Sequence, residues 1–230
     1  GNNITAKGGE NAMAVIALAQ KGGFLNAPDV YMKKISANTQ NQKIVSLQQD
    51  LRSNIKELAQ FKQVNIEDLV ICILNRERHI DDIETIRSSG ARIKMIDDGD
   101  VSAVIASVID SSNIDMYYGI GGAPEGVLAA AALQCLGGSI EGQLIFYNEQ
   151  EILRAKKTEI KDLNKFYSLD DLAHGDIMFS ATGVTDGTML KGIKITKNYA
   201  ETHSIVMRSK TGTIRHINSE HNFLIKKLEH

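Results

Sequence analysis

The sequence predicts an α/β protein with a mainly parallel sheet, and three observations support this class. Short apolar runs typical of strands alternate with helical patterns over residues 68–136. Gly90 stops one helical run and Pro124 stands in the first turn of another, as helix boundaries favour. The 230 residues are 43% hydrophobic and 23% charged, which suits a globular chain. Alternation of strand and helix is typical of parallel sheets.

The elements follow from local pattern. Residues 11–28 are expected to form a strand, a Gly-Gly turn and a second strand, and residues 44–61 a helix with leucine and isoleucine at helical spacing. Further strands are expected at 68–74, 92–97 and 114–120, and helices at 79–90, 99–110 and 124–136. The remainder is strand-rich, at 139–148, 176–183, 204–209 and 212–219, and the last two strands form a hairpin.

Charge and cysteine content narrow the class of protein. The formal net charge of −2 favours neither nucleic acid nor an anionic membrane as a partner. No apolar run approaches the roughly 20 residues of a membrane span. The two cysteines, Cys72 and Cys135, fall in apolar segments, which is typical of buried thiols in a reducing compartment. We therefore expect a cytoplasmic protein.

Three predicted strands end in loops rich in charged residues or glycine. These loops are "NRERHID" (75–81), "DDGD" (97–100) and "GIGGAPEG" (119–126). Ligands of α/β proteins bind at the carboxyl ends of strands, so these loops are expected to share one crevice. Arg76 and Arg78 of the first loop suit a phosphate, although a solvated charged turn is the alternative.

The other polar residues of the loops also have purely structural alternative roles. Asp98 and Asp100 flank Gly99, where they suit sugar hydroxyls but also ordinary turn and capping chemistry. His79 is either a catalytic base or a surface residue at a helix start.

The third loop presents a conflict of charge. Gly119 and Gly121 fit a dinucleotide fingerprint, but Pro124 stands where the third glycine belongs. Glu125 would repel a phosphate bound there, unless a divalent cation lies between them. A favourable interaction of Glu125 with the helix dipole is the structural alternative.

Together, "KGGFLNAPDVYMKK", "RERHID", "DDGD", "YGIGGAPEGV", "FSATGVTDG" and "TIRHINS" resemble the class II (GlpX-type) fructose-1,6-bisphosphatases over nearly the whole chain. The resemblance implies the lithium-sensitive phosphatase superfamily, with its layered α/β/α/β/α sandwich. Residues 1–65 are then the C-terminal part of an incomplete N-terminal sugar-phosphatase domain, and residues 66–230 form a C-terminal α/β phosphatase domain.

The resemblance also implies an activity and its partners. The family hydrolyses the 1-phosphate of fructose 1,6-bisphosphate in gluconeogenesis, with Mn²⁺ or Mg²⁺. Some members accept sedoheptulose 1,7-bisphosphate, and a homodimer or homotetramer is expected.

Matching motif positions assign roles by resemblance. Glu125 matches a metal ligand. Asn2 stands where the family has a threonine that helps to position the attacking water. Substrate-contacting positions are matched by Gly1, Asn2, Tyr31, Arg76, Glu77, Arg78, Asp98, Gly99, Asp100 and Gly122.

Two alternatives remain. Most metal ligands of the family lie in a segment that would precede Gly1, so a non-catalytic sugar-phosphate-binding fragment is the first. The second is a nucleotide-binding oxidoreductase built on the glycine-rich loop. The segment 179–187, "FSATGVTDG", is either a second anion site or a core turn.

Overall fold

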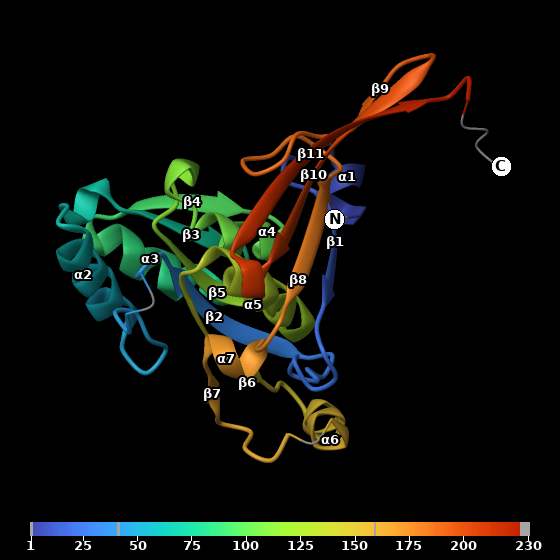
Figure 1. Cartoon of the computed structure of the whole chain (residues 1–230). Coiled ribbons are helices and arrows are strands. Elements are labelled where there is room, and N and C mark those ends of the chain that lie inside the picture. Colours follow the sequence, from blue (N-terminus) through green and yellow to red (C-terminus); the bar gives the residue numbers. More distant parts are fainter. Residues whose placement is uncertain (1, 41, 159, 226–230) are drawn as a thin grey trace.

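The strands of the protein form two sheets in the computed structural model, which describes residues 2–40, 42–158 and 160–225 (Figure 1). The six-stranded sheet contains β2 (Tyr31–Ala37), β3 (Val70–Leu74), β4 (Arg92–Ile96), β5 (Met116–Gly122), β6 (Ser139–Ile145) and β7 (Phe166–Tyr167). Its strand order is β4-β3-β5-β2-β6-β7. Both β4 and β5 run parallel to β3, whereas β2, β6 and β7 join antiparallel.

The second sheet is entirely antiparallel over the described residues. It contains β1 (Met13–Leu18), β8 (Met178–Gly183), β9 (Lys194–Ile195), β10 (Tyr199–Arg208) and β11 (Thr213–Asn222). The order is β1-β8-β10-β11, with β9 beside β10. The predicted hairpin is confirmed as β10 and β11. Among the residues that the structure describes, parallel pairing is thus confined to β3, β4 and β5, fewer strands than a mainly parallel sheet implies.

Helices separate and cover the sheets. They are α1 (Asn2–Ala6), α2 (Leu51–Lys62), α3 (Ile80–Ser89), α4 (Asp100–Ala106), α5 (Ala123–Leu136), α6 (Glu149–Lys157) and α7 (Leu169–Leu172). Short 3₁₀ helices are η1 (Ile66–Asp68), η2 (Glu77–His79), η3 (Asp110–Ser112) and η4 (Ser209–Thr211). Between them, α2 and α3 cover one face of the six-stranded sheet, while α5 packs against both sheets (Figure 1). The described residues therefore form α/β/α/β layers, and the α/β class is confirmed.

Alternation along the strands creates two cores. In β3, Ile71 and Ile73 face the core beneath α2 and α3, whereas Cys72 faces the core around α5. Residues 129–133 of α5 are fully buried. A helix that is apolar on all sides is expected where sheets enclose it on two faces.

Several predicted elements need correction. The second strand expected within residues 11–28 is wrong, because the described part of the chain offers Phe24 only an isolated bridge, to Ala173. The helix expected from residue 44 begins at Leu51, since Asp50 caps it by accepting a hydrogen bond from the Ser53 N–H at 2.9 Å. The strand β2 and the helix α6 were not predicted. The helix stop at Gly90 is confirmed, with φ of 94°.

The chain crosses the predicted domain boundary in both sheets. From residues 1–65, β1 pairs with β8 and β2 pairs with β5 and β6. The division at residue 65 remains a prediction. Across the described ranges, no helix combines the length and the apolar character needed to cross a membrane.

Candidate active site

The three loops singled out in the sequence meet at one end of the six-stranded sheet. Because β4 and β5 both pair in parallel with β3, their carboxyl ends lie at the same edge. Side chains join the loops directly. Arg76 Nη2 lies 2.9 Å from Asp98 Oδ1, which links the first loop to the second. Arg78 Nη2 donates to the Ile120 carbonyl oxygen at 2.6 Å, which links the first loop to the third. The predicted shared position of the loops is confirmed.

Arg78 lies between the glycine-rich loop and an aromatic pair. Its Nε also donates to the Ile120 carbonyl oxygen, at 3.2 Å, and its guanidinium lies over the Tyr31 ring, 5.0 Å from the centroid. The Tyr31 ring in turn packs edge-on against Tyr147, with the centroids 5.6 Å apart. An exposed guanidinium held by a carbonyl and a ring face keeps its remaining N–H groups for an anion.

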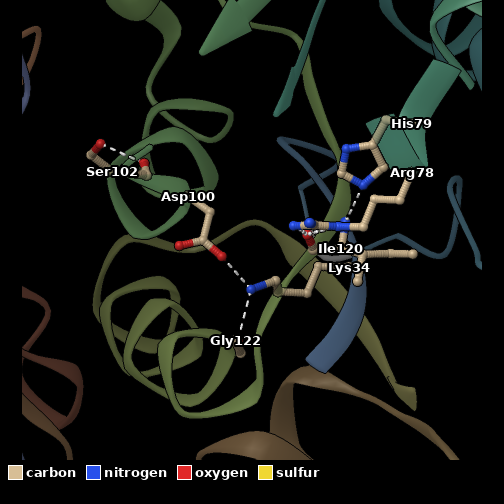
Figure 2. A network of polar contacts seen from close by, with 8 residues as sticks. Lys34, Arg78, His79, Asp100, Ser102, Ile120 and Gly122 are labelled. Atoms are coloured by element: carbon tan, nitrogen blue, oxygen red, sulfur yellow. Dashed lines mark hydrogen bonds and ion pairs between the residues drawn. The ribbon is translucent and has the colours of Figure 1, made fainter. Parts of the chain in front are cut away.

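A buried ion pair lies beneath the glycine-rich loop and was missed in the sequence. Lys34 on β2 is 1% exposed, and its Nζ lies 2.5 Å from Asp100 Oδ2 and 2.9 Å from the Gly122 carbonyl oxygen (Figure 2). Each partner compensates the charge of the other in a buried site, where the side chains of Lys34 and Asp100 are 1% and 12% exposed. Asp100 is thus fixed through one carboxylate oxygen, and Gly122 through its carbonyl.

His79 is fully buried, so the expectation of a surface position is wrong. Its Nδ1 lies 2.9 Å from the Leu74 carbonyl oxygen. Its Nε2 accepts a hydrogen bond from the Ile120 N–H at 2.9 Å (Figure 2). These partners assign the neutral tautomer with the proton on Nδ1. Burial lowers the pKa of His79, while the hydrogen bond to Leu74 acts in the opposite direction. With both nitrogens engaged, the ring offers no site for a catalytic base.

Two glycines leave room for carboxylates. A Cβ atom on Gly121 would lie 2.2 Å from Asp100 Oδ2, and one on Gly122 would lie 1.9 Å from Glu125 Oε2. Asp100 and Glu125 therefore both lie against the backbone of this loop, and a larger residue at either glycine would require a carboxylate to move. Glu125 is exposed in the first turn of α5, a position that also favours a negative charge near the helix dipole.

Glu125 is the carboxylate of this loop that a divalent cation could use. Among the residues that the structure describes, no three His, Cys, Asp or Glu side chains gather as a metal-binding group. Mg²⁺ and Mn²⁺ prefer oxygen ligands, and Mg²⁺ commonly takes one or two protein carboxylates together with substrate phosphate and water. Glu125 fits one such ligand position beside the loop.

The other predicted residues are placed as follows. Gly99 has φ of 90° and precedes α4, where a left-handed conformation favours glycine. A Cβ atom on Gly99 would lie 3.1 Å from Ile4 Cδ1, so α1 packs against the second loop. Asn2 is exposed at the start of α1, and Gly1 lies outside the described residues. Glu77 is exposed in η2 and forms no ion pair with a described residue.

The segment 179–187 has a structural role in the second sheet. The Ala12 N–H donates to Thr185 Oγ1 at 3.0 Å, the Asn11 N–H donates to the Asp186 carbonyl at 2.8 Å, and Phe179 is buried in the core. These contacts favour the core turn over the anion site.

A cavity of about 1070 Å³ adjoins this turn, whereas a cavity of about 400 Å³ lies beside the second loop and α1.

The chain is similar to proteins of one bacterial family. The family described as bacterial fructose-1,6-bisphosphatase, glpX-encoded, matches residues 1–221. A protein of Trichodesmium erythraeum named D-fructose 1,6-bisphosphatase class 2/sedoheptulose 1,7-bisphosphatase is 39% identical, over 97% of this chain and 68% of that protein. A protein of the same name from Gloeobacter violaceus is 38% identical, over 96% of this chain and 68% of that protein.

Proposed function

Because the chain belongs to the glpX-encoded bacterial fructose-1,6-bisphosphatase family, we propose that it hydrolyses fructose 1,6-bisphosphate at the 1-phosphate. The products are fructose 6-phosphate and inorganic phosphate. The meeting of Arg76, Arg78 and Glu125 at one sheet edge is the observation that supports this most. Sedoheptulose 1,7-bisphosphate is a second proposed substrate, because the relatives carry both substrates in their names. The oxidoreductase and the non-catalytic alternatives receive no support from these similarities.

The reaction demands charge stabilisation above all. Hydrolysis of a phosphate monoester is among the slowest uncatalysed reactions, because water must attack an anionic phosphoryl group. A divalent cation held by Glu125 would polarise the phosphoryl oxygens and lower the pKa of a bound water. Substrate phosphate, water and other protein groups complete its coordination in this proposal.

The protein's own residues orient the substrate. Arg76 and Arg78 bind the phosphate that is not cleaved, with Tyr31 beside them and Glu77 contributing only its backbone. Asp98, Gly99 and Asp100 contact the sugar. Asp100 presents Oδ1 to a sugar hydroxyl, since its Oδ2 is bound by Lys34. Gly122 contributes a backbone contact, and Gly1 and Asn2 lie on the substrate side, with Asn2 next to the attacking water.

We further propose Mn²⁺ or Mg²⁺ as the metal, a cytoplasmic location, and a homodimer or homotetramer. The activity suits gluconeogenesis and glycerol metabolism, in which sugar bisphosphates are converted to monophosphates. Initial rates of phosphate release from each sugar bisphosphate, with Mn²⁺, Mg²⁺ or chelator, test the proposal. Metal-dependent turnover is expected. Equal rates with and without metal would exclude the proposed chemistry.

Arg78→Ala is expected to raise KM for fructose 1,6-bisphosphate about tenfold or more while kcat changes little. The reason is that Arg78 binds a phosphate that does not react, so its contact is similar in the ground and transition states. Steady-state kinetics measure both constants. Arg52→Ala, on the exposed side of α2, is the control and should match the unmodified protein. An unchanged KM in Arg78→Ala would remove Arg78 from the phosphate site.

A further inference from the structure

We propose that His79 is a positioning residue of the sugar-phosphate site, which fixes the backbone of Ile120 so that the carbonyl oxygen of this residue can anchor Arg78. This inference deepens the proposed function and rests on it for the identity of the substrate. It assigns a task to a histidine that no part of the phosphatase chemistry uses directly.

The backbone of Ile120 is held at both of its polar groups. His79 Nε2 accepts from the Ile120 N–H at 2.9 Å, and Arg78 donates to the Ile120 carbonyl oxygen at 2.6 and 3.2 Å. Two consecutive residues of η2 therefore grip the two polar ends of one residue on β5 (Figure 2). The position of the Arg78 guanidinium depends on where His79 holds Ile120.

The other ring nitrogen, Nδ1, anchors His79 to the end of β3. Nδ1 donates to the carbonyl oxygen of Leu74, which is the last residue of β3. The ring thereby joins the carboxyl ends of two parallel strands, β3 and β5, whose described ladder pairs involve only Ile71 and Cys72 of β3. Beyond these pairs, His79 connects the two strands through Leu74 and Ile120, close to where the first and third loops begin.

The space around the ring allows little movement. A Cβ atom on Gly119 would lie 3.4 Å from His79 Cε1 and 3.3 Å from the Tyr117 hydroxyl oxygen. His79 is 0% exposed. A ring enclosed in this way holds one orientation and one tautomer, as a positioning group requires.

The arrangement works only while the ring is neutral, because a protonated Nε2 cannot accept from Ile120. The charged or titratable groups around the ring are Arg78 on η2, Asp82 on α3, Lys33 on β2 and Tyr117 on β5. Asp82 favours the protonated ring, whereas Arg78 and Lys33 oppose it. Burial, the largest influence, lowers the pKa of His79 below its ordinary 6.5.

This pKa has a defined effect on stability. Below the ordinary value the unfolded chain binds a proton that the folded chain does not, so stability rises with pH there. The contribution of His79 is complete above pH 6.5 and is lost as pH falls toward the lowered pKa. In His79→Gln this part of the pH dependence should disappear from urea denaturation curves, because the amide does not titrate.

Two substitutions separate the two hydrogen bonds. The side-chain amide of asparagine reaches the position of Nδ1, so His79→Asn keeps a donor for Leu74 and loses the acceptor for Ile120. The amide oxygen of glutamine reaches the position of Nε2, so His79→Gln keeps the acceptor for Ile120. Each variant loses one bond, and a general loss of stability would affect both alike.

The proposal expects the two variants to differ in function. KM for fructose 1,6-bisphosphate should rise about tenfold in His79→Asn, the size of one lost hydrogen bond, and much less in His79→Gln. Little change in kcat is expected for either. Amide hydrogen exchange at Ile120 should be faster in His79→Asn than in His79→Gln. Equal KM and equal exchange in the two variants would overturn the proposal.

Two readouts do not depend on activity. Nitrogen NMR of the unmodified protein should show His79 with its proton on Nδ1 and none on Nε2, with exposed His174 as reference in the same spectrum. A proton on Nε2 would overturn the proposal.

If no sugar bisphosphate is hydrolysed, the proposed function fails, but the proposed role of His79 can still be tested. Calorimetry then measures the affinity for inorganic phosphate, which should be weaker in His79→Asn than in His79→Gln. Equal affinities would overturn the proposed role of His79.

Discussion

Glu125→Gln is expected to lower kcat/KM for fructose 1,6-bisphosphate by about two to three orders of magnitude at saturating Mn²⁺. Glutamine keeps the size of the side chain and its place against Gly122, but removes the charge that would hold a divalent cation. The loss should appear in turnover, and more Mn²⁺ should be needed for half-maximal rate. Metal titrations at fixed substrate measure both effects.

The structural alternative for Glu125 makes a different prediction. If the carboxylate served only the dipole of α5, its loss would cost about 0.3–1 kcal/mol of stability and leave kinetics intact. Thermal unfolding of the same variant provides this comparison. Glu57→Gln, an identical change at an exposed position of α2, is the control and should alter neither quantity. Near-normal kinetics in Glu125→Gln would exclude Glu125 as a metal ligand.

Lys34→Met is expected to destabilise the protein by about 3–5 kcal/mol, the cost of breaking a buried ion pair by removing one partner. Methionine fills a similar volume, but Asp100 then keeps its charge without a cation, and the Gly122 carbonyl loses its donor. Urea denaturation at pH 7 measures the change. Activity should fall as well, because Asp100 and the glycine-rich loop lose their common anchor.

The matched controls lie next to the site. Lys33→Met on the same strand removes a half-buried lysine over the Tyr118 ring and should cost about 1 kcal/mol or less. The double variant Lys34→Met/Asp100→Asn should be more stable than Lys34→Met alone, because the unpaired charge is gone. A loss below about 1 kcal/mol in Lys34→Met would mean that the pair contributes little.

Local pattern was sufficient for the loops of the site but not for their foundation. The turns after β3, β4 and β5 were visible because each follows an apolar run, and parallel strands place such turns together. Lys34 was not visible. A lysine interrupts the apolar pattern of β2, and its partner Asp100 lies 66 residues away in the chain. The same lysine explains why β2 was missed as a strand.

His79 shows the same limit. Its neighbours in the sequence are charged and indicate a surface helix start, yet its ring is buried by contact with Ile120, 41 residues further along. The wrong strand near Phe24 has the opposite cause. That segment has strand-like composition, but within the described ranges its only bridge is the one between Phe24 and Ala173. Long-range pairing decided both outcomes, and no local pattern contains it.

The most direct test of the central proposal follows the substrate by phosphorus NMR with Mg²⁺ as the metal. The proposal predicts that the 1-phosphate signal of fructose 1,6-bisphosphate disappears as inorganic phosphate forms, with fructose 6-phosphate remaining, and that chelation stops the reaction. Loss of the 6-phosphate instead, or no metal-dependent release from either position, would contradict it.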